Sequence, residues 1–388
     1  MKLGKKGEPE KSILFSRPIP KSTFSGKTPN VLIGSYGYPE VNVGALVDEE
    51  NNTTLDNPKF LAKTNNDINN ILKQRQSLIN SQLKIKVKNI KHKFSETTQD
   101  IAKSALPVDS EVELEKPLSL NASFYDQAMP HGPSALLKKM DLTSNPKIPK
   151  QIESATSDTD VKAQDAMEEL GKKGFDEYYL TRLLSTGTLG IDRKIVPTKW
   201  AITAVDDNIA KEIRLTVLDY PDINPTLFTG NYLGNYYVII MMPGDWSFEL
   251  IEYVNKDTIY NQGDEIIVGQ DHEFAQGRKK YAENTTGGYY AARLPILHFL
   301  KKQKKQGRVV IFRTITKEYT VPLGVWVVRE GVRNSLIRPV RSDEISDTDT
   351  LLKAAKEEIK KLGINDPDKF LSLSVILKEE QKTLKRWF

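Results

Sequence analysis

The segment from about residue 175 to 341 constrains the fold most, because short strand-like runs alternate there with helical stretches. Residues 236–242 and 246–254 are apolar and are separated by a Pro-Gly turn, which predicts two strands joined in a β-hairpin. Residues 291–305 have a helical pattern with a basic end, and 308–313 predict a further strand. This mixture predicts an α/β or α+β fold, with a mixed sheet core and flanking helices.

Two further short stretches predict local structure. Residues 200–207, Trp-Ala-Ile-Thr-Ala-Val-Asp-Asp, predict a buried strand that ends in a helix cap, with the helix over 208–218. Residues 83–88 alternate apolar residues with lysine. This alternation predicts a half-exposed strand whose lysines either protect a sheet edge or face a polyanion.

Composition along the chain predicts five parts. They are an N-terminal Gly/Pro-rich segment (1–60), a helix and edge-strand region packing on the core (61–150), a central α/β core (160–341), C-terminal helices (342–380) and a flexible C-terminal peptide (381–388). The polar, proline-broken stretch 144–160 predicts a loop or linker between the second and third parts.

Composition also excludes several kinds of chemistry. The 388 residues include no cysteine and 4 histidines, which excludes disulfides, thiol catalysis and cysteine-ligated zinc, so we expect no metal and no cofactor. The net charge of +5 permits nucleic-acid binding without requiring it. No run approaches the roughly 18 apolar residues of a membrane span, and the N-terminus lacks an apolar signal core. We therefore expect a cytoplasmic protein without a membrane partner.

The last eight residues, Gln-Lys-Thr-Leu-Lys-Arg-Trp-Phe, form the sharpest motif. On a helical turn, Leu384, Trp387 and Phe388 share one side and can enter an apolar groove together, while Gln381 offers an amide. The pattern resembles the box by which DNA-processing proteins bind the sliding clamp PCNA. The alternative is that Trp387 and Phe388 pack back on their own domain.

Several segments in one order resemble the archaeal Nre family of DNA repair proteins. They are 37–44, 200–207, 242–252, 287–295 and 322–333, so the resemblance covers about residues 30 to 340 and the C-terminal peptide. It implies a role in the repair of damaged DNA and binding of the sliding clamp, and it implies little about chemistry. Members typically have an N-terminal four-cysteine finger, which this chain lacks. The basic residues among positions 1–25 could instead bind phosphates or form a solvated arm.

Aromatic and basic residues in the central segment are candidates for contact with nucleic acid. Glycines that permit close approach, tyrosines that stack on bases and arginines that bind phosphates are the parts of a single-strand site. The candidates are Tyr289, Tyr290, Arg293, Arg329 and Arg333, with a phosphate-facing patch formed by Lys301, Lys302, Lys304, Lys305 and Arg308. The alternative places the two tyrosines in the core and the lysines at a solvated helix end.

Acidic residues of the central segment are weak candidates for a catalytic metal site. They are Asp206, Asp207, Asp245 and Glu249. In the alternative, the aspartates at 206 and 207 cap a helix and Glu249 lies on the exposed face of a strand. His272, between two acidic residues, is a weak candidate for a general base.

Three functions follow as hypotheses. The first is a DNA repair factor recruited by PCNA through the C-terminal box, with DNA as a probable second partner. The second is an enzyme that processes nucleotides or DNA with the acidic and arginine residues of the core. The third is a structural adaptor without DNA contact, so whether the chain is an enzyme stays open.

Overall fold

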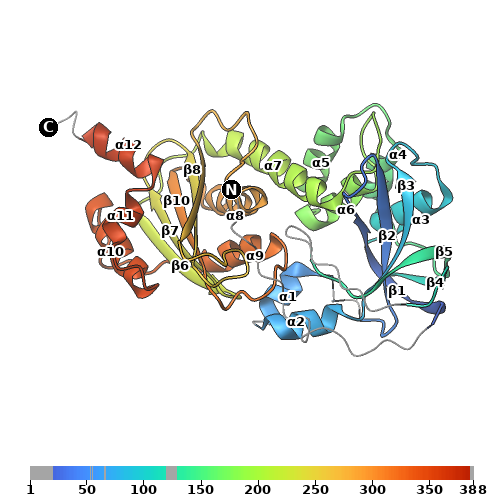
Figure 1. Cartoon of the computed structure of the whole chain (residues 1–388). Coiled ribbons are helices and arrows are strands. Elements are labelled where there is room, and N and C mark those ends of the chain that lie inside the picture. The colour runs from blue at the N-terminus through green and yellow to red at the C-terminus, as the bar shows by residue number, and fades with distance from the viewer. Residues whose placement is uncertain (1–20, 53, 55, 65–66, 119–128, 385–388) are drawn as a thin grey trace. The chain divides into compact units, whose positions relative to one another are not determined.

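A computed structural model describes residues 21–52, 54, 56–64, 67–118 and 129–384. Within these ranges the chain divides into two units (Figure 1). The barrel unit contains residues up to Ile209 and the short segment Pro322–Gly324, and the sheet unit contains the rest from Ala210. The boundary falls inside helix α7 (Thr198–Val217).

The barrel unit is built on five strands that close on themselves. They are β1 (Thr23–Ile33), β2 (Glu40–Asp48), β3 (Ile79–Lys86), β4 (Val108–Leu114) and β5 (Ser134–Leu142), in the order β1-β2-β3-β5-β4. Every pair is antiparallel except β3 with β5. Helix α3 (Lys93–Lys103) lies between β3 and β4 in the chain. This strand order, with a helix between the third and fourth strands, is that of an OB-fold barrel.

Strand β1 closes the barrel because it pairs with two neighbours. Its first half pairs with β4 and its second half with β2, and the register shifts between Lys27 and Asn30. A bulge of this kind bends a strand so that it can leave one partner for another. Gly26 is required at the bend, because a Cβ there would lie 2.3 Å from the carbonyl oxygen of Asp48.

Five further helices complete the barrel unit. They are α1 (Pro58–Thr64), α2 (Ile68–Arg75), α4 (Lys150–Ser157), α5 (Ala163–Lys172) and α6 (Glu177–Ser185). Ile152 of α4, Met167 of α5 and Leu180 of α6 are buried in a second apolar cluster. Helix α4 therefore lies inside the stretch where a polar linker was expected. Ile152 is the one buried side chain of this eight-residue helix, and a single apolar position is too little to predict a helix from the sequence.

The sheet unit has a five-stranded mixed sheet. Its strands are β6 (Thr226–Tyr232), β7 (Asn235–Met242), β8 (Ser247–Val254), β9 (Ile267–Glu273) and β10 (Arg308–Ile315), in the order β6-β7-β10-β8-β9. The predicted strands exist, and the mixed α/β class is confirmed. The predicted hairpin between β7 and β8 is wrong, because β10 lies between them and runs parallel to β8. The tight hairpin is β6–β7, whose two-residue loop has positive φ at both Leu233 and Gly234.

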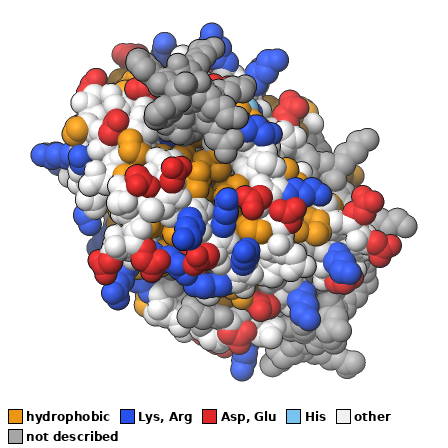
Figure 2. All heavy atoms as spheres, turned by 90° about the vertical axis from the view of Figure 1, so that its left-hand side faces the viewer, with side chains coloured by type: hydrophobic (Ala, Val, Ile, Leu, Met, Phe, Trp, Pro, Cys, Tyr) orange, Lys and Arg blue, Asp and Glu red, His pale blue; other side chains and the backbone are white. Residues whose placement is uncertain are grey.

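Helices cover both faces of this sheet (Figure 1). On one side lie α8 (Gly287–Gln303) and α9 (Trp326–Ser335), and on the other lie α10 (Thr348–Lys361), α11 (Pro367–Leu371) and α12 (Val375–Leu384). The second group packs Leu351, Phe370 and Ile376 on apolar residues of the strands. On its outer face, acidic and basic side chains are interspersed around apolar ones, without a patch of one sign (Figure 2).

The stretch expected as a buried strand at 200–207 is helical. It forms the first part of α7, in which Ala201 and Val205 are buried and Trp200 is exposed. The spacing of four between the buried residues is helical, and the β-branched residues that suggested a strand are tolerated because tertiary packing outweighs their weak local preference. Among the described residues, no helix has the length and apolar character needed to cross a membrane.

Candidate nucleic-acid interface

Arg293, the central candidate for phosphate binding, lies inside the sheet unit. It is 1% exposed, and its guanidinium is 2.6 Å from Oε2 of Glu273, which is also buried. The other oxygen of Glu273 accepts a hydrogen bond from the Trp246 indole at 3.0 Å. A buried arginine is held in place by a paired carboxylate, since either charge alone would be costly to remove from water.

Tyr289 and Tyr290 are also buried, at 0% and 5% exposure. The Tyr289 ring packs edge-on against Phe248, and the Arg293 guanidinium lies 5.5 Å from its centroid. Burial raises the pKa of the Tyr289 hydroxyl well above its ordinary value. Stacking on a base requires an open ring face, so the alternative interpretation, in which these tyrosines belong to the core, fits their position.

The Gly-Gly pair before these tyrosines allows helix α8 to approach a second buried ion pair. A Cβ on Gly288 would lie 2.7 Å from Oε1 of Glu252, which pairs with Arg313. Arg313 also donates to Oδ1 of Asn235 through Nε at 3.0 Å. Burial raises the pKa of Glu252, an effect that the Arg313 charge opposes. The close approach that the glycines predict is therefore an approach to the protein's own strands.

The remaining basic candidates differ in exposure. Arg329 on α9 is buried, and Arg333 is half-buried and lies 2.5 Å from Glu330. Lys301, Lys302 and Lys304 are exposed at the end of α8, whereas Lys305 and Arg308 are half-buried. Of the ten candidates for nucleic-acid contact, these three lysines are the exposed ones, and Lys305, Arg308 and Arg333 are partly exposed.

The four candidate catalytic carboxylates are divided between the two units. Asp206 and Asp207 lie in α7 within the barrel unit, whereas Asp245 and Glu249 lie in the sheet unit. Asp245 is exposed, and Glu249 is fully buried, so the expectation that Glu249 lies on an exposed strand face is wrong. Within the described residues, no group of three or more Asp, Glu or His side chains is arranged to hold a metal ion.

Glu249 instead holds the start of helix α12. Its two carboxylate oxygens accept hydrogen bonds from the backbone nitrogens of Val375, at 2.9 Å, and Ile376, at 3.2 Å. Its carboxylate also accepts hydrogen bonds from Ser374 Oγ and Gln270 Nε2. A carboxylate at a helix N-terminus satisfies free amide groups and interacts favourably with the helix dipole.

Helix α12 carries the first half of the C-terminal box. Its backbone is helical through Leu384, so Gln381 and Leu384 lie three residues apart on one helix. Trp387 and Phe388 lie outside the described residues.

His272, the weak candidate for a general base, lies on strand β9. Its neighbour Asp271 is buried and accepts hydrogen bonds from the backbone nitrogens of Asn284 and Thr285, at 2.9 and 2.7 Å. Arg278 pairs with the same carboxylate at 3.0 Å. Asp271 therefore organises the loop before α8, while the His272 ring lies edge-on to Phe274.

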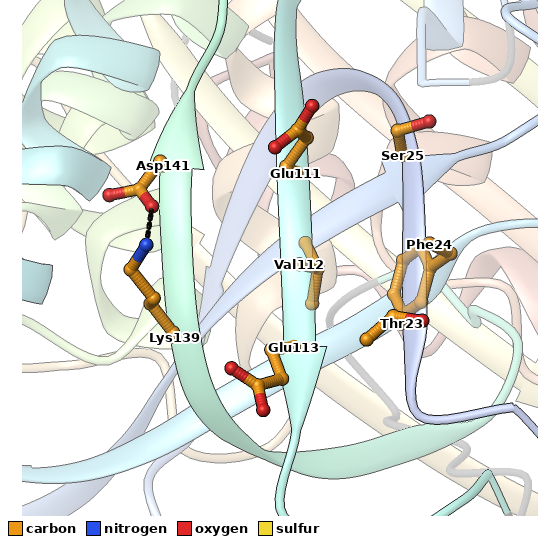
Figure 3. A pocket seen from close by; sticks show the side chains of 8 residues that line it. All are labelled: Thr23, Phe24, Ser25, Glu111, Val112, Glu113, Lys139 and Asp141. Carbon is orange, nitrogen blue, oxygen red and sulfur yellow. Dashed lines mark ion pairs between the residues drawn. The ribbon is translucent and has the colours of Figure 1, made fainter.

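An open hollow of about 380 Å³ lies on the barrel unit (Figure 3). Its lining comes from β1, β4 and β5 and includes Glu111, Glu113, Lys139 and Asp141. Lys139 is 2.5 Å from Asp141, and the hydrogen bond to that carboxylate raises the pKa of the lysine. Lys138 of the same strand lies 2.6 Å from Glu113, so the charges on this side of the barrel are largely balanced, and it offers no excess of positive charge to a polyanion.

Sequence reasoning did not single out the exposed aromatic residues of the barrel unit. Tyr36 is 89% exposed and lies in the turn between β1 and β2, and in the same turn the Tyr38 ring lies 5.2 Å from that of Trp200. The glycines that flank Tyr36 indicated a turn, and a turn that exposes a large ring is a usable signal.

The chain is thus a two-unit protein of mixed α/β architecture, with an OB-type barrel ahead of a mixed sheet. Residues 10–261 match the family described as "Archaeal Nre, N-terminal", and residues 273–387 match "Archaeal Nre, C-terminal". The chain belongs to the archaeal Nre family.

Curated relatives agree with this family. The DNA repair protein NreA of Archaeoglobus fulgidus is 36% identical over 79% of this chain and 78% of its own length. NreA of Haloferax volcanii is 32% identical over 89% of this chain and 84% of its own length. The DNA repair protein NreB of A. fulgidus is 33% identical over 94% of this chain and 92% of its own length. No solved structure matches the chain.

Proposed function

We propose that this chain is a DNA repair factor that is brought to DNA by the sliding clamp PCNA, which binds residues 381–388. The repair role is supported by the names of the NreA and NreB relatives, each of which is covered over at least 78% of its length. Coverage of this extent means that the similarity includes both units and not one shared domain.

The observation that carries the clamp assignment is the course of helix α12 into the box. The helix starts at a fixed point, the carboxylate of Glu249, and its backbone remains helical through Leu384. Residues three or four apart lie on one helix face, so a box that is helical when it binds would present Gln381, Leu384, Trp387 and Phe388 together. Large aromatic anchors of this kind dominate the free energy of peptide recognition.

Contact with DNA would add to clamp binding. The exposed lysines Lys301, Lys302 and Lys304 at the end of α8 can neutralise phosphates. Because the clamp encircles DNA, a tethered protein meets the duplex at a high local concentration, so two modest affinities act together.

The test is calorimetric titration of the full chain into PCNA of the same host. The double variant Trp387→Ala/Phe388→Ala is expected to lose about 2 kcal/mol or more of binding free energy per anchor, or roughly a thousandfold in all. Lys382→Ala, at a variable position of the same box, is the matched control and is expected to bind within a few fold of the wild type.

Circular dichroism melting separates the two interpretations of the terminus. Clamp binding that survives the double variant contradicts the proposal. A double variant with a lowered melting temperature would instead identify Trp387 and Phe388 as residues that stabilise their own domain.

A further inference from the structure

Three aromatic side chains of the barrel unit are exposed in or beside the turn between β1 and β2. Tyr36 and Tyr38, in the turn between β1 and β2, are 89% and 46% exposed, and Trp200, at the start of α7, is 44% exposed. The ring centroids of Tyr38 and Trp200 are 5.2 Å apart, with the planes tilted by 59°. Rings that are tilted in this way do not cover each other's faces, so stacking surface stays open to a ligand.

A row of lysines lies beside this turn. Lys84 and Lys86 on β3 are exposed, as is Lys88 in the turn two residues past the strand end, whereas the alternate residues Ile85 and Val87 are buried in the barrel core. Lys84 and Lys86 share the outer face of β3, because successive side chains of a strand point to opposite sides, and Lys88 continues the alternation of exposed and buried residues.

The backbone places the lysine row next to the aromatic turn. The nitrogen of Val87 donates to the carbonyl oxygen of Pro39 at 2.9 Å, and Lys86 pairs with Glu40 in the strand register. On the other side, the backbone nitrogen of Ile195 donates a hydrogen bond to the carbonyl oxygen of Val87 at 2.8 Å. This contact brings the segment with the exposed Lys194 alongside. Glu40 and Asp192 are the exposed acidic residues on these neighbouring segments, against Lys84, Lys86, Lys88 and Lys194, so positive charge is in excess.

We infer that this surface, defined by Tyr36, Tyr38, Trp200, Lys84, Lys86 and Lys88 and called the barrel patch, binds single-stranded DNA. Bases stack on exposed aromatic rings and phosphates pair with neighbouring cations, and OB barrels use their second and third strands and the turn between the first two for such ligands. The inference rests on the proposed role at DNA. It adds that the DNA is single-stranded and that it binds at the barrel patch.

The charge distribution over the barrel favours this side. The outer surface of β4 and β5 carries Glu111, Glu113 and Asp141 around the hollow of Figure 3, with Lys138 and Lys139 paired to two of these carboxylates, while β3 carries the lysine row. Positive charge is therefore in excess on the β3 side and largely balanced on the other, so a polyanion is attracted to the β3 side. A single strand is favoured over a duplex, because bases in a duplex are already stacked on one another and cannot reach the rings.

The test measures fluorescence anisotropy of labelled dT16, at several salt concentrations, with the full chain and without PCNA. The wild type is expected to bind dT16 at least about tenfold more tightly than a duplex of the same length. The Tyr36→Ala/Tyr38→Ala variant is expected to bind dT16 at least about tenfold more weakly, with the salt dependence unchanged. Tyr36 is so exposed that its removal leaves the fold intact, which a melting curve checks.

A triple variant tests the lysine row. Lys84→Gln/Lys86→Gln/Lys88→Gln is expected to lower the slope of log K against log salt by about 2, since each single-strand phosphate contact contributes about 0.7. The matched control, Lys353→Gln/Lys360→Gln/Lys361→Gln on α10, removes the same charge from exposed positions of the sheet unit and is expected to keep the slope for dT16.

Trp200 provides an independent signal. Trp246 and Trp326 are buried, so in the Trp387→Ala/Phe388→Ala chain a base that stacks on Trp200 is expected to quench the tryptophan emission, and the quenching should disappear when Trp200→Phe is added. Unchanged dT16 affinity in the tyrosine variant, a slope change confined to the α10 control variant, or tighter binding of rU16 than dT16 would each overturn the inference. The Trp387→Ala/Phe388→Ala chain is expected to bind dT16 normally, so a failure of clamp binding is distinguished from a failure of the barrel patch.

Discussion

Glu249 Oε1 on strand β8 accepts a hydrogen bond from the backbone nitrogen of Val375, 2.9 Å away, and so ties the last helix to the sheet. The two residues are 126 positions apart in the chain. The helix that begins at this contact continues through Leu384 into the C-terminal box. A carboxylate in the sheet therefore sets where the helix with the proposed clamp-binding residues starts.

Replacing this carboxylate is expected to release helix α12. In Glu249→Ala, the amides of Val375 and Ile376 lose their acceptor inside the protein, and hydrogen bonds to a charged group contribute about 1.5–3 kcal/mol each. The free energy of unfolding is expected to fall by about 3 kcal/mol or more in urea denaturation, with faster amide exchange over residues 375–378.

Asp245→Ala is the matched control for this variant. It removes an exposed carboxylate from the turn just before the same strand and is expected to change stability by no more than about 0.5 kcal/mol. Equal effects of the two variants would mean that Glu249 does not hold the helix.

Arg293 is expected to matter for stability and not for DNA affinity. Arg293→Ala leaves Glu273 buried without its partner, which typically costs about 3–5 kcal/mol. Arg293→Met/Glu273→Met removes both charges and is expected to recover part of that loss. Lys301→Ala, on the exposed end of the same helix, is expected to leave the urea midpoint unchanged. A folded Arg293→Ala chain with normal stability and weakened DNA binding would restore the phosphate-binding interpretation.

Two helical glycines are expected to respond in opposite ways to alanine. In Gly288→Ala, the new methyl group meets Oε1 of Glu252 at 2.7 Å, and overpacking of this kind costs about 1–3 kcal/mol. In Gly171→Ala, on α5, nothing lies within 4 Å of the new atom, so the higher helix propensity of alanine should stabilise the chain by up to about 1 kcal/mol. Thermal melting of the two variants checks the opposite signs, and a neutral Gly288→Ala would show that α8 can shift.

Local signals predicted the elements of the sheet unit better than their arrangement. Strand β8 and the basic end of α8 follow from apolar alternation and from charge, and Asp347 caps α10 as an acidic loop before a helix suggests. The hairpin prediction failed because a Pro-Gly turn reports only local chain reversal. It cannot show that β10, which follows more than fifty residues later, inserts between the two strands.

The candidate site was harder to predict for a related reason. A sequence shows that Arg293 is charged, but the carboxylate that allows it to be buried comes from β9 and is brought there by the fold. The lysine alternation at 83–88 did indicate an outward-facing row, with two interpretations left open. Its position beside Tyr38 and Trp200 depends on barrel closure and on α7, which no local pattern encodes.

His131 is expected to make the barrel unit less stable in acid. Its ring is 3% exposed, and its Nδ1 is 2.8 Å from the carbonyl oxygen of Gly132. Burial lowers the pKa of His131 from 6.5 to about 4, with the Gly132 carbonyl and Asp56 opposing that change and Arg75 adding to it. The unfolded chain therefore binds a proton between pH 6.5 and 4 that the folded chain does not bind.

The sign of the effect follows from this difference in proton binding. The stabilising contribution is fully present above the unfolded pKa and is lost as the pH falls toward 4, with a loss of about 2 kcal/mol between pH 7 and pH 5. His131→Gln keeps a polar side chain of similar size without a titrating group, so its unfolding free energy should fall by about 2 kcal/mol less over the same range. Urea denaturation of both chains at pH 7 and pH 5 measures this difference. Equal losses in both chains would mean that His131 accepts a proton in the folded state and that its burial is incomplete in solution.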